Sequence, residues 1–461
     1  MFDETIAAIA TPLGEGGLAV IRLSGGNAFA IADKCFLPVG KSSCKPSAAP
    51  THTIQFGKIV RDKKIIDEVL LSVLRAPRTF TREDTVEISC HGGLLPAKLV
   101  LDTVLNNGAR AAEPGEFTKR AFLNGRIDLA QAEAVADLIH SRTELALAAA
   151  NEQLAGKLSQ RINTLRDDLI LTMAHVEAHI DFPEEDIAPA TKKNLLQRLE
   201  NGLAFMDELL RTADEGQILR RGIRAAIIGR PNAGKSSLLN QLLGRDRAIV
   251  SPIAGTTRDT IEETANIRGL PVVFIDTAGL RESCDEIEIE GIRRSRESLA
   301  QAELILHVLD AGEPLTDADK NYFAEFAGKK TILVRNKTDL PVKLEMNSEF
   351  RIQNSQAEFL DVCCTSGKGI EALKDAIKNL VWAGEIRAEM LQVAISSRHQ
   401  DALERARTAT RAATDALRAD ATLELVALDL RIGANAVGEV VGKTTTEDLL
   451  DSIFSTFCIG K

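Results

Sequence analysis

The sequence predicts a multidomain protein: an α+β N-terminal domain, followed by an all-α helical domain into which an α/β P-loop domain is inserted. Three observations support this architecture. Short β-rich runs fill the first part of the chain, amphipathic stripes flank its middle third, and a glycine-rich phosphate-loop pattern lies within that third. With 461 residues, of which 44% are hydrophobic, the chain can bury several separate cores.

In the N-terminal region, short apolar runs are separated by Gly, Pro and Ser, a pattern typical of β-strands. These runs are residues 17–23, 53–57, 68–74 and 85–89. We therefore expect an α+β domain over residues 1–124. Arg22 and Glu87 lie within two of the runs, and the pattern leaves open whether they face a ligand or only the surface.

The helical domain is predicted in two halves that flank the P-loop domain. Apolar residues at 154, 158, 162, 165 and 169 recur at helical spacing, and the pattern returns at 398–418 and 423–430. An inserted domain is favoured because domain termini often lie close together. Two separate helical domains remain the alternative. The expected limits are 125–215 and 382–461 for the helical halves and 216–381 for the inserted domain.

The most specific motif is the run from Gly229 to Ser236, which fits the phosphate-loop spacing GxxxxGK[ST]. An apolar run at 223–228 precedes it and a helical run follows it, as the motif requires. Lys235 would reach the β and γ phosphates, and the Ser236 hydroxyl would ligate Mg²⁺. The phosphates would lie at a helix N-terminus, which favours an anion. The loop residues expected to contact the nucleotide are Asn232, Ala233, Gly234, Lys235, Ser236 and Ser237.

Two further motifs follow predicted strands and select the nucleotide. The run 272–275 leads to Asp276, Thr277, Ala278 and Gly279, and the run 331–334 leads to Asn336, Lys337 and Asp339. Asp276 would hold Mg²⁺ through water, and the Gly279 amide would sense the γ phosphate. A buried Asp339 would accept two hydrogen bonds from guanine, which adenine cannot donate in that arrangement. The three motifs in this order predict a GTPase.

The segment between the first two motifs is a natural switch segment, in which Thr257 can complete the Mg²⁺ shell. It spans residues 251–259, and its residues expected to contact the nucleotide are Ser251, Pro252, Ile253, Ala254, Gly255, Thr256 and Thr257. Leu280 stands where Ras-like GTPases carry a water-orienting Gln. Two replacements are candidates: Asn232, which could bind a K⁺ that acts like an arginine finger, and the acidic stretch 285–288. A merely solvated acidic loop remains the alternative for that stretch.

Composition limits the partners and the compartment. The net charge is -10 and the isoelectric point is near 5.4, so an RNA partner would need local contacts rather than a basic surface. The seven cysteines show no CxxC pair, which argues against a zinc site and a disulfide framework. With no signal-peptide pattern and no run of 18 apolar residues, we expect a cytosolic protein without a membrane partner.

Stretches outside the P-loop domain are more distinctive than the nucleotide motifs. They are DETIAAIATP at 3–12, FTRED at 80–84, HGG at 91–93, PGEFTKRAFLN at 114–124, DLAQAEA at 128–134 and FCIGK at 457–461. With these residues the chain closely resembles the family of tRNA modification GTPases called MnmE or TrmE, over essentially its full length.

The resemblance implies a homodimer whose N-terminal domains bind formyl-tetrahydrofolate. Its helical domains would carry Ras-like G domains that meet across the dimer when GTP and K⁺ bind. It implies an FAD-dependent partner subunit, a heterotetramer with that partner, and tRNA as substrate. Together the two proteins would install aminomethyl-type groups at C5 of the wobble uridine.

The resemblance also assigns residues by position. Glu288 would polarise the attacking water indirectly, and Ser236 and Thr257 would hold Mg²⁺. K⁺ would be held by Asn232, Thr256 and the backbone oxygens of Ser251 and Ile253. The folate site would be lined by Arg22, Glu87, Arg126 and Lys461.

The fifth G motif departs from the family pattern. Cys363 and Cys364 stand where the family has Ser-Ala, and they would act at the guanine mainly through a backbone N–H. Cys458 is interpreted as a buried packing cysteine, with a catalytic thiol as the alternative.

Two other functions remain open. One is a ribosome-associated assembly GTPase. The sequence after the G domain argues against it, because it contains no KH or other RNA-binding signature. The other is a folate-dependent one-carbon transferase regulated by its G domain.

Overall fold

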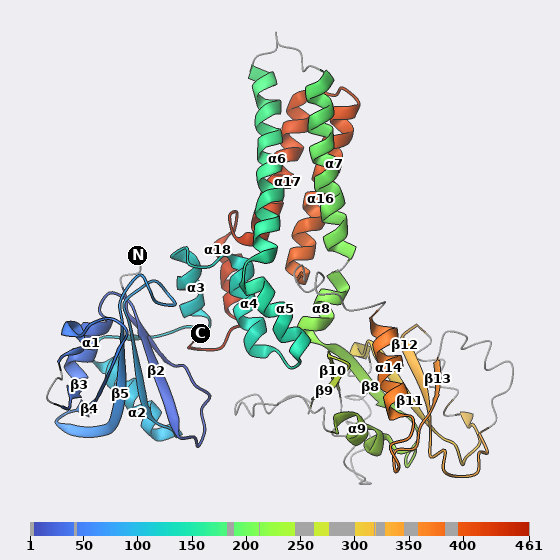
Figure 1. Ribbon diagram of the computed structural model, residues 1–461, viewed down its shortest axis with the longest axis horizontal. Coiled ribbons are helices and arrows are strands. Elements are labelled where there is room, and N and C mark those ends of the chain that lie inside the picture. The colour runs from blue at the N-terminus through green and yellow to red at the C-terminus, as the bar shows by residue number, and fades with distance from the viewer. Residues whose placement is uncertain are drawn as a thin grey trace.

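The computed structural model describes residues 4–40, 44–181, 189–211, 213–244, 262–275, 300–317, 319, 328–344, 358–382 and 395–460. Figure 1 shows three parts: an N-terminal α/β part, an upright bundle of helices, and a second α/β part on the other side of the bundle's base. The predicted multidomain architecture is confirmed.

The N-terminal part is a seven-stranded sheet in the order β3-β4-β5-β6-β2-β1-β7, antiparallel except for the pair β1 and β7. Its strands are β1 (Ile6–Ile9), β2 (Leu18–Ser24), β3 (Phe36–Pro38), β4 (Thr53–Arg61), β5 (Lys64–Leu74), β6 (Thr85–His91) and β7 (Arg110–Ala111). Helices α1 (Ala28–Cys35) and α2 (Leu94–Asn106) bury one face of the sheet in an apolar core. The 3₁₀ turn η1 (Pro46–Ala48) packs on α1.

The other face of this sheet carries a row of directly paired residues. Ile54 lies opposite Ser72, Ser72 opposite Glu87, Glu87 opposite Arg22, and Arg22 opposite Ala8. Because paired residues on neighbouring strands point to the same face, Arg22 and Glu87 share it. Helix α3 (Glu116–Leu123) covers only the β1 end of this face, through the side chain of Phe117.

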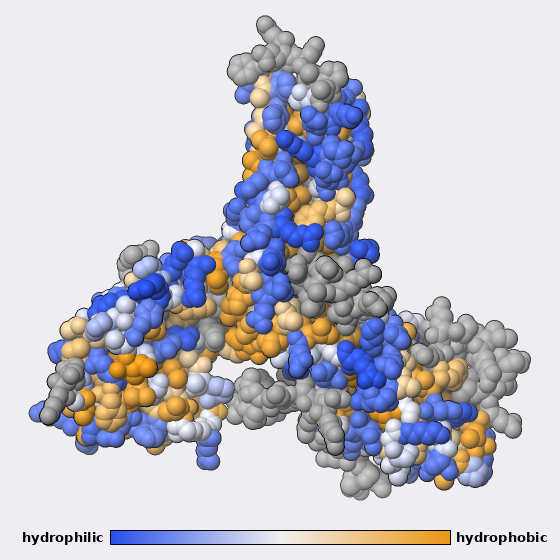
Figure 2. Space-filling model, viewed as in Figure 1, coloured by the Kyte–Doolittle hydropathy of each residue, from blue (hydrophilic) through white to orange (hydrophobic). Residues whose placement is uncertain are grey.

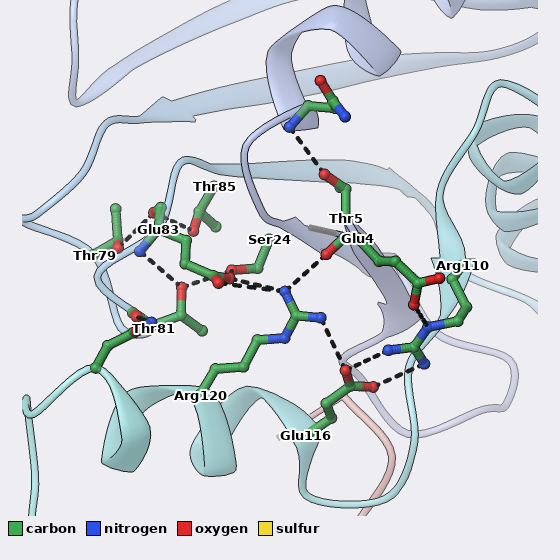
Figure 3. Close-up of polar contacts among 12 residues, drawn as sticks. Glu4, Thr5, Ser24, Thr79, Thr81, Glu83, Thr85, Arg110, Glu116 and Arg120 are labelled. Atoms are coloured by element: carbon green, nitrogen blue, oxygen red, sulfur yellow. Dashed lines mark hydrogen bonds and ion pairs between the residues drawn. The ribbon is translucent and has the colours of Figure 1, made fainter. Parts of the chain in front are cut away.

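A buried ionic network holds α3 against the sheet (Figure 3). The Arg120 guanidinium, only 1% exposed, donates to a Glu83 carboxylate oxygen at 3.1 Å, to the Glu4 carbonyl at 3.0 Å and to Glu116 at 2.9 Å. Arg110 also pairs with Glu116, at 2.6 Å. Burial would raise the pKa of Glu116, but the hydrogen bonds from Arg110 and Arg120 lower it. The FTRED and PGEFTKRAFLN stretches therefore meet through Arg120 and Glu83.

The helical part has one core built from both halves of the chain. Four long helices, α6, α7, α16 and α17, form the bundle, and shorter helices gather at its base (Figure 1). The helices are α4 (Leu129–His140), α5 (Glu144–Leu154), α6 (Lys157–Asp181), α7 (Pro189–Arg211), α8 (Ala213–Arg221), α16 (Ser397–Arg418), α17 (Leu423–Val441) and α18 (Glu447–Phe454). Helix α8 packs on α5, α7 and α16, and it also packs on the second α/β part, in whose core Ile218 and Leu219 lie.

Helix α17 is longer than the sequence pattern predicts. It continues past residue 430 through Gly433 and Gly438, which usually weaken a helix. A Cβ at Gly433 would lie 3.0 Å from the Thr410 hydroxyl oxygen, and one at Gly438 would lie 2.8 Å from that of Thr444. The two glycines thus permit close packing that compensates their low helix propensity.

The second α/β part has a six-stranded sheet in the order β13-β12-β11-β8-β10-β9, in which only β9 is antiparallel to its neighbour. Its elements are β8 (Ile223–Ile228), α9 (Lys235–Leu243), β9 (Glu263–Ile267), β10 (Leu270–Phe274), β11 (Leu304–Asp310), β12 (Lys330–Asn336), β13 (Glu358–Asp361) and α14 (Ile370–Val381). Every residue of β11 is buried, as expected for a central parallel strand. Trp382, after α14, is 1% exposed in this core.

None of the helices among these described ranges is long and apolar enough to cross a membrane.

The network around Arg120 yields a stability prediction. Arg120→Met would leave the buried carboxylates of Glu83 and Glu116 without their central partner, a loss of about 3 kcal/mol. We expect the α3 amides to exchange hydrogen about 100-fold faster, measured by mass spectrometry of peptides covering α3. Lys119→Met, which removes only the exposed pair with Asp451, is the matched control and should change exchange little. Equal exchange in both variants would contradict this role of Arg120.

Candidate functional site

The phosphate loop follows β8 and is shaped by residues with positive φ. These are Gly229 at 143°, Asn232 at 62° and Gly234 at 96°. A Cβ at Gly229 would lie 2.3 Å from the Val308 carbonyl oxygen, so only glycine allows the loop to pass β11 this closely. Helix α9 begins directly after the loop, and its N-cap residue, Gly234, has no side chain with which to cap the first amides. Its N-terminus can therefore receive an anion.

Lys235 folds back over this loop. Its Nζ atom donates to the Gly229 carbonyl at 2.9 Å and to the Arg230 carbonyl at 2.8 Å. Burial lowers the pKa of Lys235, because the charged ammonium is partly withdrawn from water. In this structure the partners of the ammonium are two neutral carbonyl groups. A phosphate at the α9 N-terminus would give it a negatively charged partner and so a stronger hydrogen bond.

Buried Asn336 joins the three nucleotide loops. Its Nδ2 atom donates to the Ala233 carbonyl at 2.9 Å, and its Oδ1 atom accepts from the Cys364 amide at 3.2 Å. A Cβ at Gly234 would lie 2.1 Å from Asn336 Nδ2, so the phosphate loop and the Asn336 loop are in direct contact. The sequence predicted that these loops bind one nucleotide. The side-chain bridge between them is seen only in the structure.

The loop after Asn336 presents Asp339 to solvent, not in a buried position as the sequence argument assumed. The thiol of Cys363 donates to Asp339 Oδ1 at 3.3 Å. Cys363 and Cys364 are both buried, and burial raises the pKa of the Cys364 thiol to about 11. The side chain of Cys363, and not only a backbone amide, thus contacts the carboxylate that would read the base.

Sequence reasoning missed Asp310, which belongs to this site. It lies at the carboxyl end of β11, and its Oδ2 atom accepts from Lys337 Nζ at 2.6 Å. Burial would raise the pKa of Asp310, but Lys337 and the Gly312 amide lower it. The position at the end of a buried parallel strand was the available signal, because ligands bind beside such ends.

Several predicted residues lie outside the described part of the chain. They are Glu288, the switch residues Ser251, Pro252, Ile253, Ala254, Gly255, Thr256 and Thr257, the motif residues Asp276, Thr277, Ala278 and Gly279, and the terminal Lys461. Leu280 lies outside it as well. In the ranges that are described, no group of three or more His, Cys, Asp or Glu is placed to hold a metal ion.

A second candidate site lies on the face of the N-terminal sheet opposite α1 and α2. Arg22 Nε pairs with Glu87 at 2.8 Å, and Arg22 Nη1 donates to the Gly460 carbonyl at 3.3 Å. The Arg22 guanidinium also lies 5.7 Å from the centre of the Phe117 ring. The C-terminal segment therefore reaches Arg22, which lies 438 positions away in the sequence.

Arg126 lies near this second site but has other partners. Its Nη1 atom donates to the Thr79 carbonyl at 2.8 Å, and its guanidinium lies 5.0 Å from the centre of the Phe80 ring. Phe80 packs on the small apolar cluster that contains Phe117. Arg126 and Arg22 are thus connected through aromatic side chains.

The position of Cys458 differs from the buried position that the sequence analysis expected. Its side chain is exposed, and the neighbouring Phe457 is buried against α18 in its place. The packing role proposed for Cys458 is therefore wrong. Phe457 fills the core because its larger apolar surface gains more from burial.

Comparisons with known proteins match both flanks of the nucleotide site. The profile "GTP-binding protein TrmE N-terminus" matches residues 5–126, and the profile "MnmE helical domain" matches residues 129–458. The chain is 48% identical to the tRNA modification GTPase MnmE of Geobacillus kaustophilus (strain HTA426), over 99% of both chains. The chain belongs to the MnmE family.

A second relative agrees with this membership of the MnmE family. The tRNA modification GTPase MnmE of Listeria welshimeri is 47% identical over 99% of both chains. Among solved structures, a variant of Aquifex aeolicus Era bound to GDP.AlF4- is 28% identical, with a TM-score of 0.28 over 40% of this chain and 66% of that one.

Proposed function

We propose that this protein is the GTP-hydrolysing component of a system that installs aminomethyl and carboxymethylaminomethyl groups at C5 of the wobble uridine of tRNA. It acts in the cytoplasm with an FAD-dependent partner, as a heterotetramer. The observation that carries the proposal is the bridge from Asn336 to Ala233 and Cys364, which unites phosphate and guanine loops within a chain of the MnmE family.

In this proposal each part has its own task. The N-terminal domain binds folate and dimerises, the G domain hydrolyses GTP, and the helical domain connects them. The proposed limits are 1–124 for the N-terminal domain, 125–215 and 382–461 for the helical domain, and 216–381 for the G domain.

GTP would be held by the loops around Asn336. The phosphates meet the α9 N-terminus and Lys235, and guanine meets Asp339, whose position Cys363 supports. Mg²⁺, coordinated by Ser236 and Thr257, would neutralise phosphate charge. K⁺, coordinated by Asn232, Thr256 and the backbone of Ser251 and Ile253, would stabilise the charge of the transition state. Glu288 would polarise the attacking water indirectly.

Formyl-tetrahydrofolate is proposed to bind beside Arg22 and Glu87, with Arg126 and Lys461 completing the site. The Glu87 carboxylate can accept hydrogen bonds and the Arg22 guanidinium can donate them. Both suit a pterin ring, which carries amide and amine groups. The rings of Phe117 and Phe80 add apolar surface next to them. These contacts support the proposal from residues far apart in the sequence.

Homodimerisation is proposed through the face of the N-terminal sheet opposite α1 and α2, on the strands β3, β4 and β5. Phe56 lies directly opposite Leu70 on this face, and both are exposed, at 46% and 45%. Ile54 and Leu37, in the neighbouring rows, are exposed at 67% and 55%. Figure 2 shows apolar surface gathered on the N-terminal part of the molecule. A contiguous apolar patch beside a ligand site supports an interface with a second copy.

The function is tested by mass spectrometry of wobble uridines in cells that lack the protein. We expect the C5 modification to disappear and to return with the wild-type gene. Gly234→Ala should not restore it, because a Cβ there would clash with Asn336. Gly328→Ala, which meets nothing within 4 Å, is the control and should restore it. Intact modification in the deleted cells would refute the proposal.

Potassium dependence gives a second prediction. Replacing K⁺ by Na⁺ should slow GTP hydrolysis at least about tenfold, because the smaller ion would fit the proposed ligands poorly. Glu288→Ala should bind GTP normally yet hydrolyse it at least about tenfold more slowly in K⁺ buffer. Phosphate-release assays measure both effects. Equal rates in the two salts would reject a K⁺ site at Asn232, and wild-type turnover of the variant would reject a role for Glu288.

Folate binding gives a third prediction, measured by isothermal titration of formyl-tetrahydrofolate into the full chain. Arg22→Met should weaken binding at least about tenfold, because the site loses its guanidinium donor and Glu87 loses its cation. Lys58→Met removes the exposed pair with Glu68 on the same sheet face and should leave binding unchanged. Binding by the Arg22 variant at wild-type strength would argue against this site.

A further inference from the structure

A buried carboxylate at the base of the bundle contacts both connections to the G domain. Glu133, on α4, accepts from Arg398 Nε at 2.6 Å and from the Ser396 hydroxyl at 3.3 Å. It also lies 3.2 Å from His399 Nε2 and 3.6 Å from Arg220 Nη2. Arg220 belongs to the segment that enters the G domain, and the other three belong to the segment that leaves it.

The groups of this cluster differ in charge. Burial would raise the pKa of Glu133, but the cationic Arg398 and Arg220 beside it lower it, so it is ionised. Burial lowers the pKa of His399 to about 3, so its ring is neutral. Because His399 Nδ1 accepts from the Ser396 amide, its Nε2 carries the proton; Nε2 lies 3.2 Å from a Glu133 carboxylate oxygen but makes no hydrogen bond within the described part of the chain. One carboxylate thus binds two cations and one neutral donor, the Ser396 hydroxyl, and lies beside the His399 ring.

The entering connection leads directly to the phosphate loop. Arg220 is held by Glu133 and, at 2.6 Å, by Asp137, and three residues later β8 begins and runs to Gly229. Gly222, between them, has a φ of 75°, and a Cβ there would lie 2.9 Å from the Pro271 carbonyl oxygen. This turn therefore fixes the direction in which β8 leaves the helical part (Figure 1).

Helix α4 continues the path to the second candidate site. Leu129 and Ala132, on the same helix as Glu133, pack with Phe454 and Phe457 of the C-terminal segment. That segment ends on Arg22 through the Gly460 carbonyl. Arg398 also donates to the Glu439 and Val440 carbonyls at the end of α17, which ties the bundle to the same cluster.

From this geometry we propose that Glu133 is a positioning residue that couples the nucleotide state of the G domain to the N-terminal site. A rotation of the G domain must move Arg220, Ser396 and Arg398 together, because all three bind one carboxylate. Helix α4 then transmits that movement to the C-terminal segment beside Arg22. The inference rests on the proposed function, because it requires that GTP hydrolysis drives tRNA modification, and it names the residue that couples the two.

The test uses Glu133→Gln in the full chain, which keeps the side-chain shape and removes the charge. We expect GTP hydrolysis to stay within about twofold of wild type. Wobble modification in cells should fall about tenfold, because the variant loses the coupling free energy between the two sites. Arg220→Met, which removes the ion pairs of the entering segment with Glu133 and Asp137, should act in the same direction. Glu177→Gln removes an exposed bundle pair with Arg431 and is the control.

A second measurement does not depend on tRNA. Hydrogen exchange of α18 and residues 455–460 is compared with GDP and with GDP plus aluminium fluoride, both in KCl. We expect wild type and Glu177→Gln to differ between the two nucleotide states, and Glu133→Gln to lose that difference while still binding nucleotide.

Three outcomes would overturn the proposal. They are an unchanged exchange difference in Glu133→Gln, no difference in wild type, and a fall of hydrolysis in parallel with modification, which would indicate a purely structural role. If wobble modification proves independent of the protein, the proposed function fails, but the exchange experiment still decides whether Glu133 couples the two sites.

Discussion

The constraint on which the architecture depends is the single core shared by both halves of the helical part. Helices α6 and α7 precede the G domain and α16 and α17 follow it, yet all four pack around the same apolar side chains. The chain must therefore leave the bundle and return to it at one place. The charges gathered around Glu133 follow from that requirement, because the two crossings meet there.

The nucleotide site obeys a similar rule on a smaller scale. Loops from β8, β12 and β13 come together because parallel strands present their carboxyl ends at one edge of the sheet. Asn336 then converts proximity into a fixed geometry, since its amide has one donor and one acceptor atom in use. Satisfying a buried amide on both sides leaves little freedom for the loops it joins.

The sequence predicted elements with strong local patterns and missed those that depend on tertiary contacts. The β8 strand and α9 helix were predictable because the phosphate-loop motif needs both. Strand β1, with only Ile6, Ala7, Ala8 and Ile9, has too little β-preference to be recognised and exists because β2 and β7 pair with it. The contact of Asp310 with Lys337 and the contacts of Glu133 join residues that are distant in sequence. A local pattern of apolar and polar residues cannot predict such contacts.

The position of Trp382 has a practical consequence. It is the sole tryptophan of the chain and lies buried in the G-domain core, directly before the segment that returns to the bundle. Its fluorescence is therefore an intrinsic optical signal of the G domain alone. The N-terminal sheet and the bundle contribute no tryptophan emission, so the melting of one part of this protein can be followed without a label while the others remain spectroscopically silent.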